Sequence, residues 1–148
     1  MSKYSENKTL FKDPELLCSA MLAMGFNSAM LEKHFDKPES LLDYRGRPTM
    51  YLDAQGDKAE LIVRRAHVNS VMRSVASNDF GFRRDASTGC YSAVISEYDS
   101  SFFNAAWLLK LKTEYSKLAV NKQALKLGYR STGTKIVNGK IRMQFIKA

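Results

Sequence analysis

Cysteine and histidine are scarce in this chain. Its 148 residues include two cysteines, Cys18 and Cys90, and two histidines, His34 and His67. Disulfide-stapled domains carry many more cysteines, and zinc sites need three or four closely spaced ligands. The sequence therefore predicts two packed core cysteines, a reducing intracellular (cytoplasmic) setting, no metal and no other cofactor.

Catalytic and phosphate-binding motifs are also lacking. The chain has no GxSxG nucleophile elbow, no GxxxxGK[ST] loop and no GxGxxG fingerprint. Its 15 acidic residues form no convincing cluster. The sequence thus favours a protein that is not an enzyme. A nucleophilic pair of Cys90 with one of the histidines stays open as an alternative, although a thiol in a strand more often serves packing.

Long apolar runs are absent. The longest spans about five residues, near Ala105 to Leu109, whereas a membrane-spanning helix needs roughly 20. The opening MSKYSENKTLFKD has no apolar signal core. We therefore expect a soluble protein that does not enter a membrane.

Acidic residues almost disappear from the last third of the chain. Residues 1–100 hold 13 Lys or Arg and 14 Asp or Glu, whereas residues 101–148 hold ten Lys or Arg and one acid, Glu114. The net charge of +8 therefore comes from the C-terminal part. Such an imbalance favours an anionic partner: nucleic acid, an acidic protein surface or a membrane surface. The alternative is a face that lysines merely solvate.

The segment from Asn104 to Leu127 predicts the longest helix. Its apolar positions share one helical face, which predicts a seam against the core, and Gly128 ends the pattern. Asp99 or Ser100 is the expected N-cap. The seam consists of Leu108, Leu111, Tyr115, Leu118 and Leu125. Phe102, Phe103 and Trp107 are expected in the core, with a partner-binding patch as the alternative.

Other regular elements have clear signals. We expect a strand over 4–12, a helix over 14–24 capped by Asp13, a hairpin over 80–95, and a tail hairpin around Asn138-Gly139, the strongest turn signal in the chain. Residues 30–35 suggest a helical turn, 41–44 a strand, and 49–53 with 59–65 a hairpin. Residues 66–78 fit either a helix or an extended segment.

These elements predict one α+β domain over residues 1–148, with an antiparallel sheet and two main helices packed on one of its faces. A ferredoxin-like topology is one candidate.

The order of elements, with several short sequence words, resembles the Ycf35 family, a domain of unknown function found in plastids, cyanobacteria and some of their viruses. The resemblance rests on the opening MSKYSENKT, the helix ending at Gly25, Tyr44-Arg45-Gly46, Ala59 to Val63, Asp79 to Phe82, Tyr115, and Leu127-Gly128-Tyr129 with the final hairpin. It implies a divergent member, with the plastid stroma or a host cytoplasm as settings and a viral origin as one alternative. The family supplies no activity to transfer.

The favoured function is nucleic-acid binding through a basic C-terminal face, with exposed tyrosines available for base stacking. The alternative is a protein-interaction module or inhibitor that docks on an acidic surface of a host or partner protein. The candidate contact residues are Arg64, Arg65, Arg83, Arg84, Lys117, Arg130, Lys135, Lys140 and Arg142.

Overall fold

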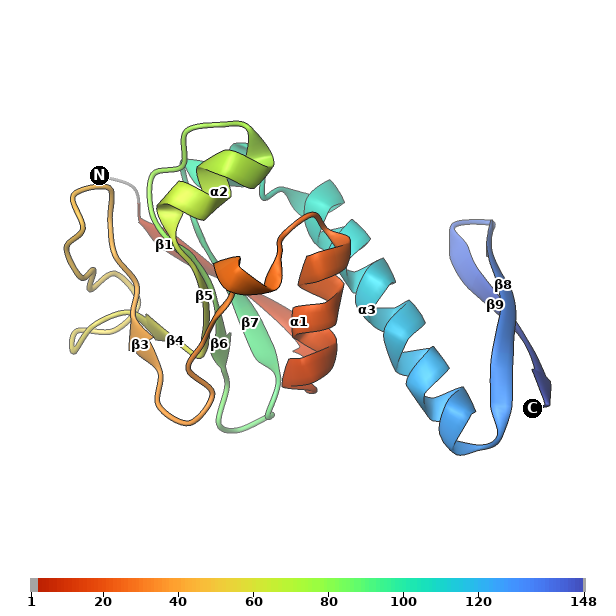
Figure 1. Ribbon diagram of the computed structural model, residues 1–148. Coiled ribbons are helices and arrows are strands. Elements are labelled where there is room, and N and C mark those ends of the chain that lie inside the picture. The colour runs from red at the N-terminus through yellow and green to blue at the C-terminus, as the bar shows by residue number, and fades with distance from the viewer. Residues whose placement is uncertain (1–2, 148) are drawn as a thin grey trace.

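The computed structural model describes residues 3–147 and has a five-stranded antiparallel sheet with strand order β1-β7-β6-β5-β2 (Figure 1). Its strands are β1 (Tyr4–Phe11), β2 (Glu32–Lys33), β5 (Leu61–Val63), β6 (Phe80–Arg84) and β7 (Tyr91–Ser96). Two short strands, β3 (Glu39–Ser40) and β4 (Lys58–Ala59), pair beside it. The predicted α+β class is confirmed, while the ferredoxin-like topology stays a prediction.

Helices cover one face of this sheet. They are α1 (Pro14–Ala23), α2 (Arg65–Met72) and α3 (Ala105–Lys126), with 3₁₀ turns η1 (Ser28–Met30) and η2 (Asp99–Ser101). Leu17, Val68 and Leu111, one from each helix, join a buried cluster with Phe80 and Phe82 of the sheet. Helix packing on one face is therefore confirmed, and α2 decides the ambiguous segment 66–78 in favour of a helix.

The opposite face is covered by the loop between β3 and β4. Leu41 and Tyr51 from this loop pack on Ile62 and Val94, so the sheet is buried on both sides. The predicted hairpin of 49–53 with 59–65 is wrong. The buried Asp57 carboxylate instead accepts hydrogen bonds from the Thr49 hydroxyl and from the backbone N–H groups of residues 51–53, which fold this segment into a loop. The strand expected over 41–44 is reduced to one bridge between Leu42 and Pro48.

The helix starts show one confirmed prediction and one error. Asp13 caps α1, since its Oδ1 accepts from the backbone N–H groups of Glu15 and Leu16. The cap of α3 is Asn104, whose side chain accepts from Trp107 N at 2.9 Å, and not Asp99 or Ser100. Asp99 is buried in η2 and accepts hydrogen bonds from the backbone of residues 77 and 78.

The aromatic residues around the start of α3 belong to the core. The Phe103 ring is 2% exposed and stacks on Phe80 with centroids 4.2 Å apart, and Trp107 meets Phe80 edge-on at 5.6 Å. These contacts fix the helix start to the middle of the sheet, so the core interpretation of these residues is confirmed.

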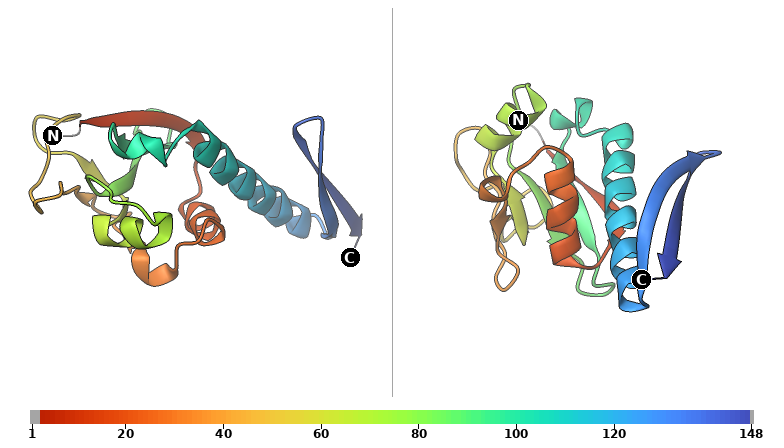
Figure 2. Two further views of the ribbon diagram at one scale, coloured as in Figure 1. Left: turned by 90° about the horizontal axis from the view of Figure 1, so that it is seen from above. Right: turned by 45° about the vertical axis from the view of Figure 1, so that its right-hand side comes forward.

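The C-terminal end of α3 extends past the edge of the sheet. Leu111 is buried, and Leu108, Tyr115 and Leu118 pack against the core, but Leu125 is 66% exposed. The predicted seam is therefore wrong at its last position, because the helix has passed the edge of the sheet by then (Figures 1 and 2).

A hairpin of β8 (Tyr129–Val137) and β9 (Lys140–Lys147) follows α3 and projects away from the sheet (Figure 2). Asn138 and Gly139 have φ angles of 52° and 74°, as a two-residue type I′ turn requires. The predicted turn is confirmed. Residues 3–118 are called the body below, and residues 119–147 the C-terminal arm.

Candidate nucleic-acid interface

Four of the nine candidate residues share one face of the hairpin. In the β8–β9 register Lys135 lies opposite Arg142, Val137 opposite Lys140, and Arg130 opposite Ile146. Directly opposed residues of an antiparallel pair project to the same side, and sides alternate along each strand. Arg130, Lys135, Lys140 and Arg142 therefore lie on one side, which we call the basic face.

A bulge makes this grouping possible. Arg130 and Lys135 are five positions apart, so strict alternation would put them on opposite sides of β8. The pairing register shifts between Ser131 and Gly133, which leaves one extra residue on β8 and restores Arg130 to the side of Lys135. All four basic side chains belong to exposed residues.

On the other side of the hairpin, the β9 residues are apolar and pack toward the helix, whereas their β8 partner Ile136 is 73% exposed. Ile141, Met143 and Phe145 are half-buried, whereas their neighbours Lys140, Arg142 and Gln144 are exposed. Both strands contact α3. Because the apolar side is turned toward α3, the basic face points into solvent.

The charged side chains of the basic face are all positive. No acidic residue follows Glu114 in the sequence. Lys135 and Arg142 lie directly opposite each other, and like charges in such a cross-strand pair are destabilising. An anion placed between these two side chains would relieve their repulsion.

The lysines of α3 divide into paired and free groups. Lys117 contacts Glu114 at 3.3 Å, and Lys122 contacts Asp13 at 2.7 Å. The hydrogen bond from Lys122 lowers the pKa of Asp13, and the same contact raises the pKa of Lys122. The Lys122 pair ties α3 to the residue that caps α1, whereas the Lys117 pair lies within α3 itself. Three exposed lysines have no ion-pair partner among residues 3–147: Lys110, Lys112 and Lys126.

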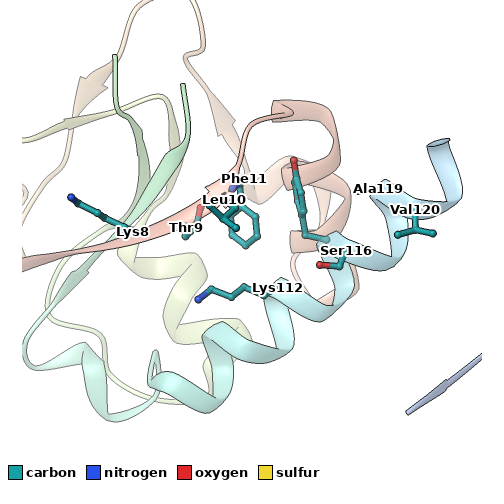
Figure 3. A pocket seen from close by; sticks show the side chains of 9 residues that line it. Lys8, Thr9, Leu10, Phe11, Lys112, Ser116, Ala119 and Val120 are labelled. Carbon is teal, nitrogen blue, oxygen red and sulfur yellow. Dashed lines mark hydrogen bonds between the residues drawn. The ribbon is translucent and has the colours of Figure 1, made fainter. Parts of the chain in front are cut away.

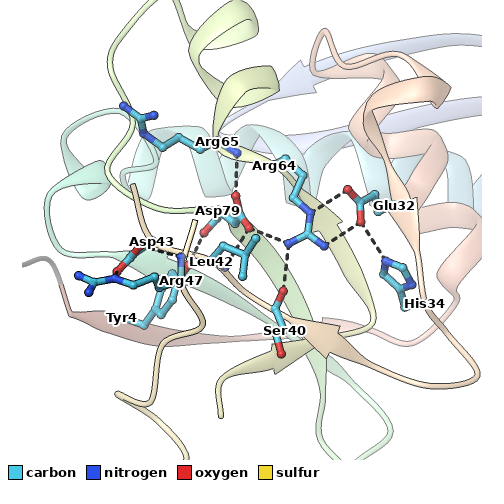
Figure 4. Close-up of polar contacts among 10 residues, drawn as sticks. All are labelled: Tyr4, Glu32, His34, Ser40, Leu42, Asp43, Arg47, Arg64, Arg65 and Asp79. Atoms are coloured by element: carbon cyan, nitrogen blue, oxygen red, sulfur yellow. Dashed lines mark hydrogen bonds and ion pairs between the residues drawn. The ribbon is translucent and has the colours of Figure 1, made fainter. Parts of the chain in front are cut away.

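Arg64 lies in the body and is fully engaged there (Figure 4). Its guanidinium donates to Glu32 at 2.7 and 2.9 Å, to Asp79 at 2.8 Å and to the Ser40 carbonyl at 3.0 Å. The hydrogen bond to Glu32 raises the pKa of Arg64, and the same bond lowers the pKa of Glu32. Arg64 is therefore a structural cross-link between β2, β5 and the start of β6.

Arg65 and Asp79 complete this network. The buried Asp79 carboxylate accepts from Arg65 N and Leu42 N, and the Arg65 side chain donates to the Ala76 carbonyl. Asp79 thus holds the first turn of α2 against the sheet (Figure 4). These contacts were not predictable from local sequence, because the partners of Arg64 and Arg65 lie 11 to 32 positions away.

Arg83 and Arg84 are neighbours on β6, so their side chains point to opposite faces of the sheet. Arg84 N donates to the carboxylate of Glu60 at 3.2 Å, and Glu60 is a buried group whose pKa is raised by desolvation. Neither arginine shares an element with the basic face. The structure thus brings together Arg130, Lys135, Lys140 and Arg142, and places the other five candidates elsewhere.

The groups considered for catalysis are placed as follows. His34 Nε2 lies 3.0 Å from Glu32 Oε1, Cys18 and Cys90 are buried, and neither cysteine is hydrogen-bonded to a histidine within residues 3–147. The same residues contain no group of three His, Cys, Asp or Glu side chains that could hold a metal ion.

None of the helices in the described part of the chain is long and apolar enough to span a membrane.

Comparison of the chain with known protein families, with curated proteins and with solved structures finds no match. The resemblance to the Ycf35 family therefore stays a prediction.

Proposed function

We propose that this protein is a non-enzymatic nucleic-acid-binding protein that uses the basic face of its C-terminal hairpin. The observation that carries the proposal is the grouping of Arg130, Lys135, Lys140 and Arg142 on one exposed side of a projecting hairpin. Lysine and arginine side chains bind phosphates and release condensed counterions, which supplies affinity without requiring a particular sequence.

The shape of the hairpin supports the same function. A two-stranded β-ribbon fits the major groove of B-form DNA, and strands are established readers of nucleic acid. Here the ribbon turns back beside the C-terminal end of α3, on the side away from the sheet, so the body does not stand between it and a large ligand (Figure 2). Gln144 lies on the same side as Arg142 and adds a hydrogen-bonding side chain among the cations.

The test is a binding titration with labelled single- and double-stranded DNA and RNA of one sequence, followed by fluorescence anisotropy between 50 and 200 mM salt. Four phosphate contacts predict a slope of about −3 to −4 for the logarithm of the association constant against that of the salt concentration. Affinity would then fall roughly 50- to 150-fold over this range.

Absence of binding to all four nucleic acids at 50 mM salt would reject the proposal. It would favour the second candidate, an accessory or inhibitory protein whose basic face docks on an acidic protein surface. The resemblance to the Ycf35 family, a viral origin and an intracellular setting are compatible with both candidates and remain predictions.

A further inference from the structure

A groove runs between the end of β1 and the middle of α3 (Figure 3). Its volume is about 430 Å³, within the range of sites that hold small organic groups. Most of its walls are apolar. The lining residues include Lys8, Leu10, Phe11, Lys112, Tyr115 and Val120.

An irregularity in β1 creates one wall of the groove. Asn7 pairs with Ala93 and Phe11 with Tyr91, so three residues of β1 oppose a single residue of β7. The Thr9 hydroxyl turns inward to the Tyr91 carbonyl, and Leu10 is pushed out to 87% exposure. A large apolar side chain held this far into solvent beside an apolar groove indicates a contact surface.

The charges around the groove are positive. Lys8 and Lys112 line it from opposite sides, and none of its lining residues is acidic (Figure 3). An occupant with an apolar part and negative charge complements these walls. A second copy of this chain carries the same net charge of +8, so charge argues against it as the occupant.

An aromatic ring is fixed at the groove. Tyr115 packs on Phe11 with ring centroids 4.5 Å apart, and its Oη accepts from the backbone N–H groups of Lys12 and Asp13 at 3.2 and 3.0 Å. An immobilised ring loses little entropy when a ligand binds beside it. Aromatic rings in positively charged grooves are the usual stacking platforms for unpaired nucleobases.

We infer that this groove receives an unstacked base of a single-stranded nucleic acid, with the neighbouring phosphates at Lys8 and Lys112. This inference rests on the proposed function and narrows its ligand to single strands. Helix α3 links the two sites: Lys112 and Lys126 are separated by roughly 21 Å along the helix. About six stacked nucleotides span that distance, so one strand can run from the groove to the end of α3, where the hairpin begins.

The experiment compares a 20-nucleotide single strand with its duplex, as DNA and as RNA, on the full chain. The groove variant is Leu10→Ser with Val120→Ser, and both positions are exposed enough to spare the fold. The matched control is Leu125→Ser, at an exposed apolar position of α3 outside the groove. The groove variant should bind the single strand about tenfold more weakly and the duplex as the wild type does, because Leu10 and Val120 supply apolar walls that hold the base at the Tyr115 ring. The DNA and RNA arms identify which single strand is preferred.

Equal affinity of the wild type for single strand and duplex would overturn the inference, and so would a groove variant that binds the single strand as the wild type does. The hairpin variant Lys135→Gln with Arg142→Gln separates the two proposals. It should weaken the binding of single strand and duplex alike, and if it weakens neither, the proposed function fails as well.

Discussion

At the scale of single residues, Arg64 differs most from its prediction. The sequence suggested a contact residue of the interface, whereas the structure shows a side chain held in an ion-pair network of the body. Two carboxylates hold its guanidinium, and the side chain of one of them, Asp79, is only 4% exposed. Replacing Arg64 by Met leaves these carboxylates without their cation. We predict a loss of about 3 kcal/mol in the free energy of unfolding, measured by urea denaturation.

The matched control for that substitution is Arg47→Met. Arg47 is more than half exposed, and its Nε lies 3.9 Å from Asp43. Exposed ion pairs of this kind contribute at most about 1 kcal/mol, so the control should unfold almost as the wild type does. A stability loss in Arg64→Met no larger than in the control would contradict the structural role of Arg64.

Glu60 gives a prediction that depends on pH. Burial raises the pKa of this carboxyl, so the folded state holds its proton more tightly than the unfolded state does. Ionisation of Glu60 therefore lowers the free energy of unfolding, and this loss grows as pH rises from the ordinary carboxyl pKa through the raised one. Glu60→Gln should be more stable than the wild type at pH 7, and this advantage should disappear near pH 4. The exposed Glu6→Gln is the control, and an equal gain in both variants would refute the explanation.

At the scale of elements, the tail hairpin depends on its turn. Gly139 has a φ of 74°, where an L side chain is strained by about 1–2 kcal/mol. Gly139→Ala should therefore loosen the hairpin, expose its backbone amides to faster hydrogen exchange and weaken nucleic-acid binding. The free energy of unfolding of the body should not change, because within residues 3–147 the hairpin makes its extensive contacts with α3 alone.

Gly133→Ala provides the comparison for Gly139→Ala. Gly133 lies on the same hairpin but has a negative or extended φ, and a Cβ there would meet no atom within 4 Å. It should leave amide exchange and binding nearly unchanged. If both alanine variants behave alike, the turn does not control the hairpin.

Elements set by local chemistry were predictable from the sequence. The Asn138-Gly139 turn and the Asp13 cap of α1 each depend on a few adjacent residues. Residues 49–53 were mistaken for a strand, because their conformation depends on the buried Asp57 carboxylate, which the alternation of apolar residues does not reveal. The cap of α3 was predicted too early in the sequence for a similar reason. The buried Asp99 carboxylate accepts hydrogen bonds from backbone N–H groups that lie 21 and 22 positions earlier in the chain.

At the scale of the whole molecule, the chain combines a body whose sheet is covered on both faces with an arm whose residues are mostly exposed. The charge imbalance in the sequence located the candidate interface in the last third of the chain. It did not separate Arg130, Lys135, Lys140 and Arg142 from the arginines of the body, because the bulge in β8 and the ion pairs of Arg64 are visible only in three dimensions. The groove beside Leu10 was missed because it joins β1 to α3 across about 100 residues.

The central claim is that the basic face of the arm binds phosphates. The most direct test measures the salt dependence of single-stranded DNA binding for the wild type and for a variant with Arg130, Lys135, Lys140 and Arg142 all changed to Gln. The control carries the same loss of charge at four exposed body residues, Lys33, Lys37, Arg45 and Lys58. Loss of four contacts should make the logarithmic salt slope of the arm variant shallower by about 3 and leave that of the control unchanged. Equal slopes in the wild type and the arm variant would contradict the claim.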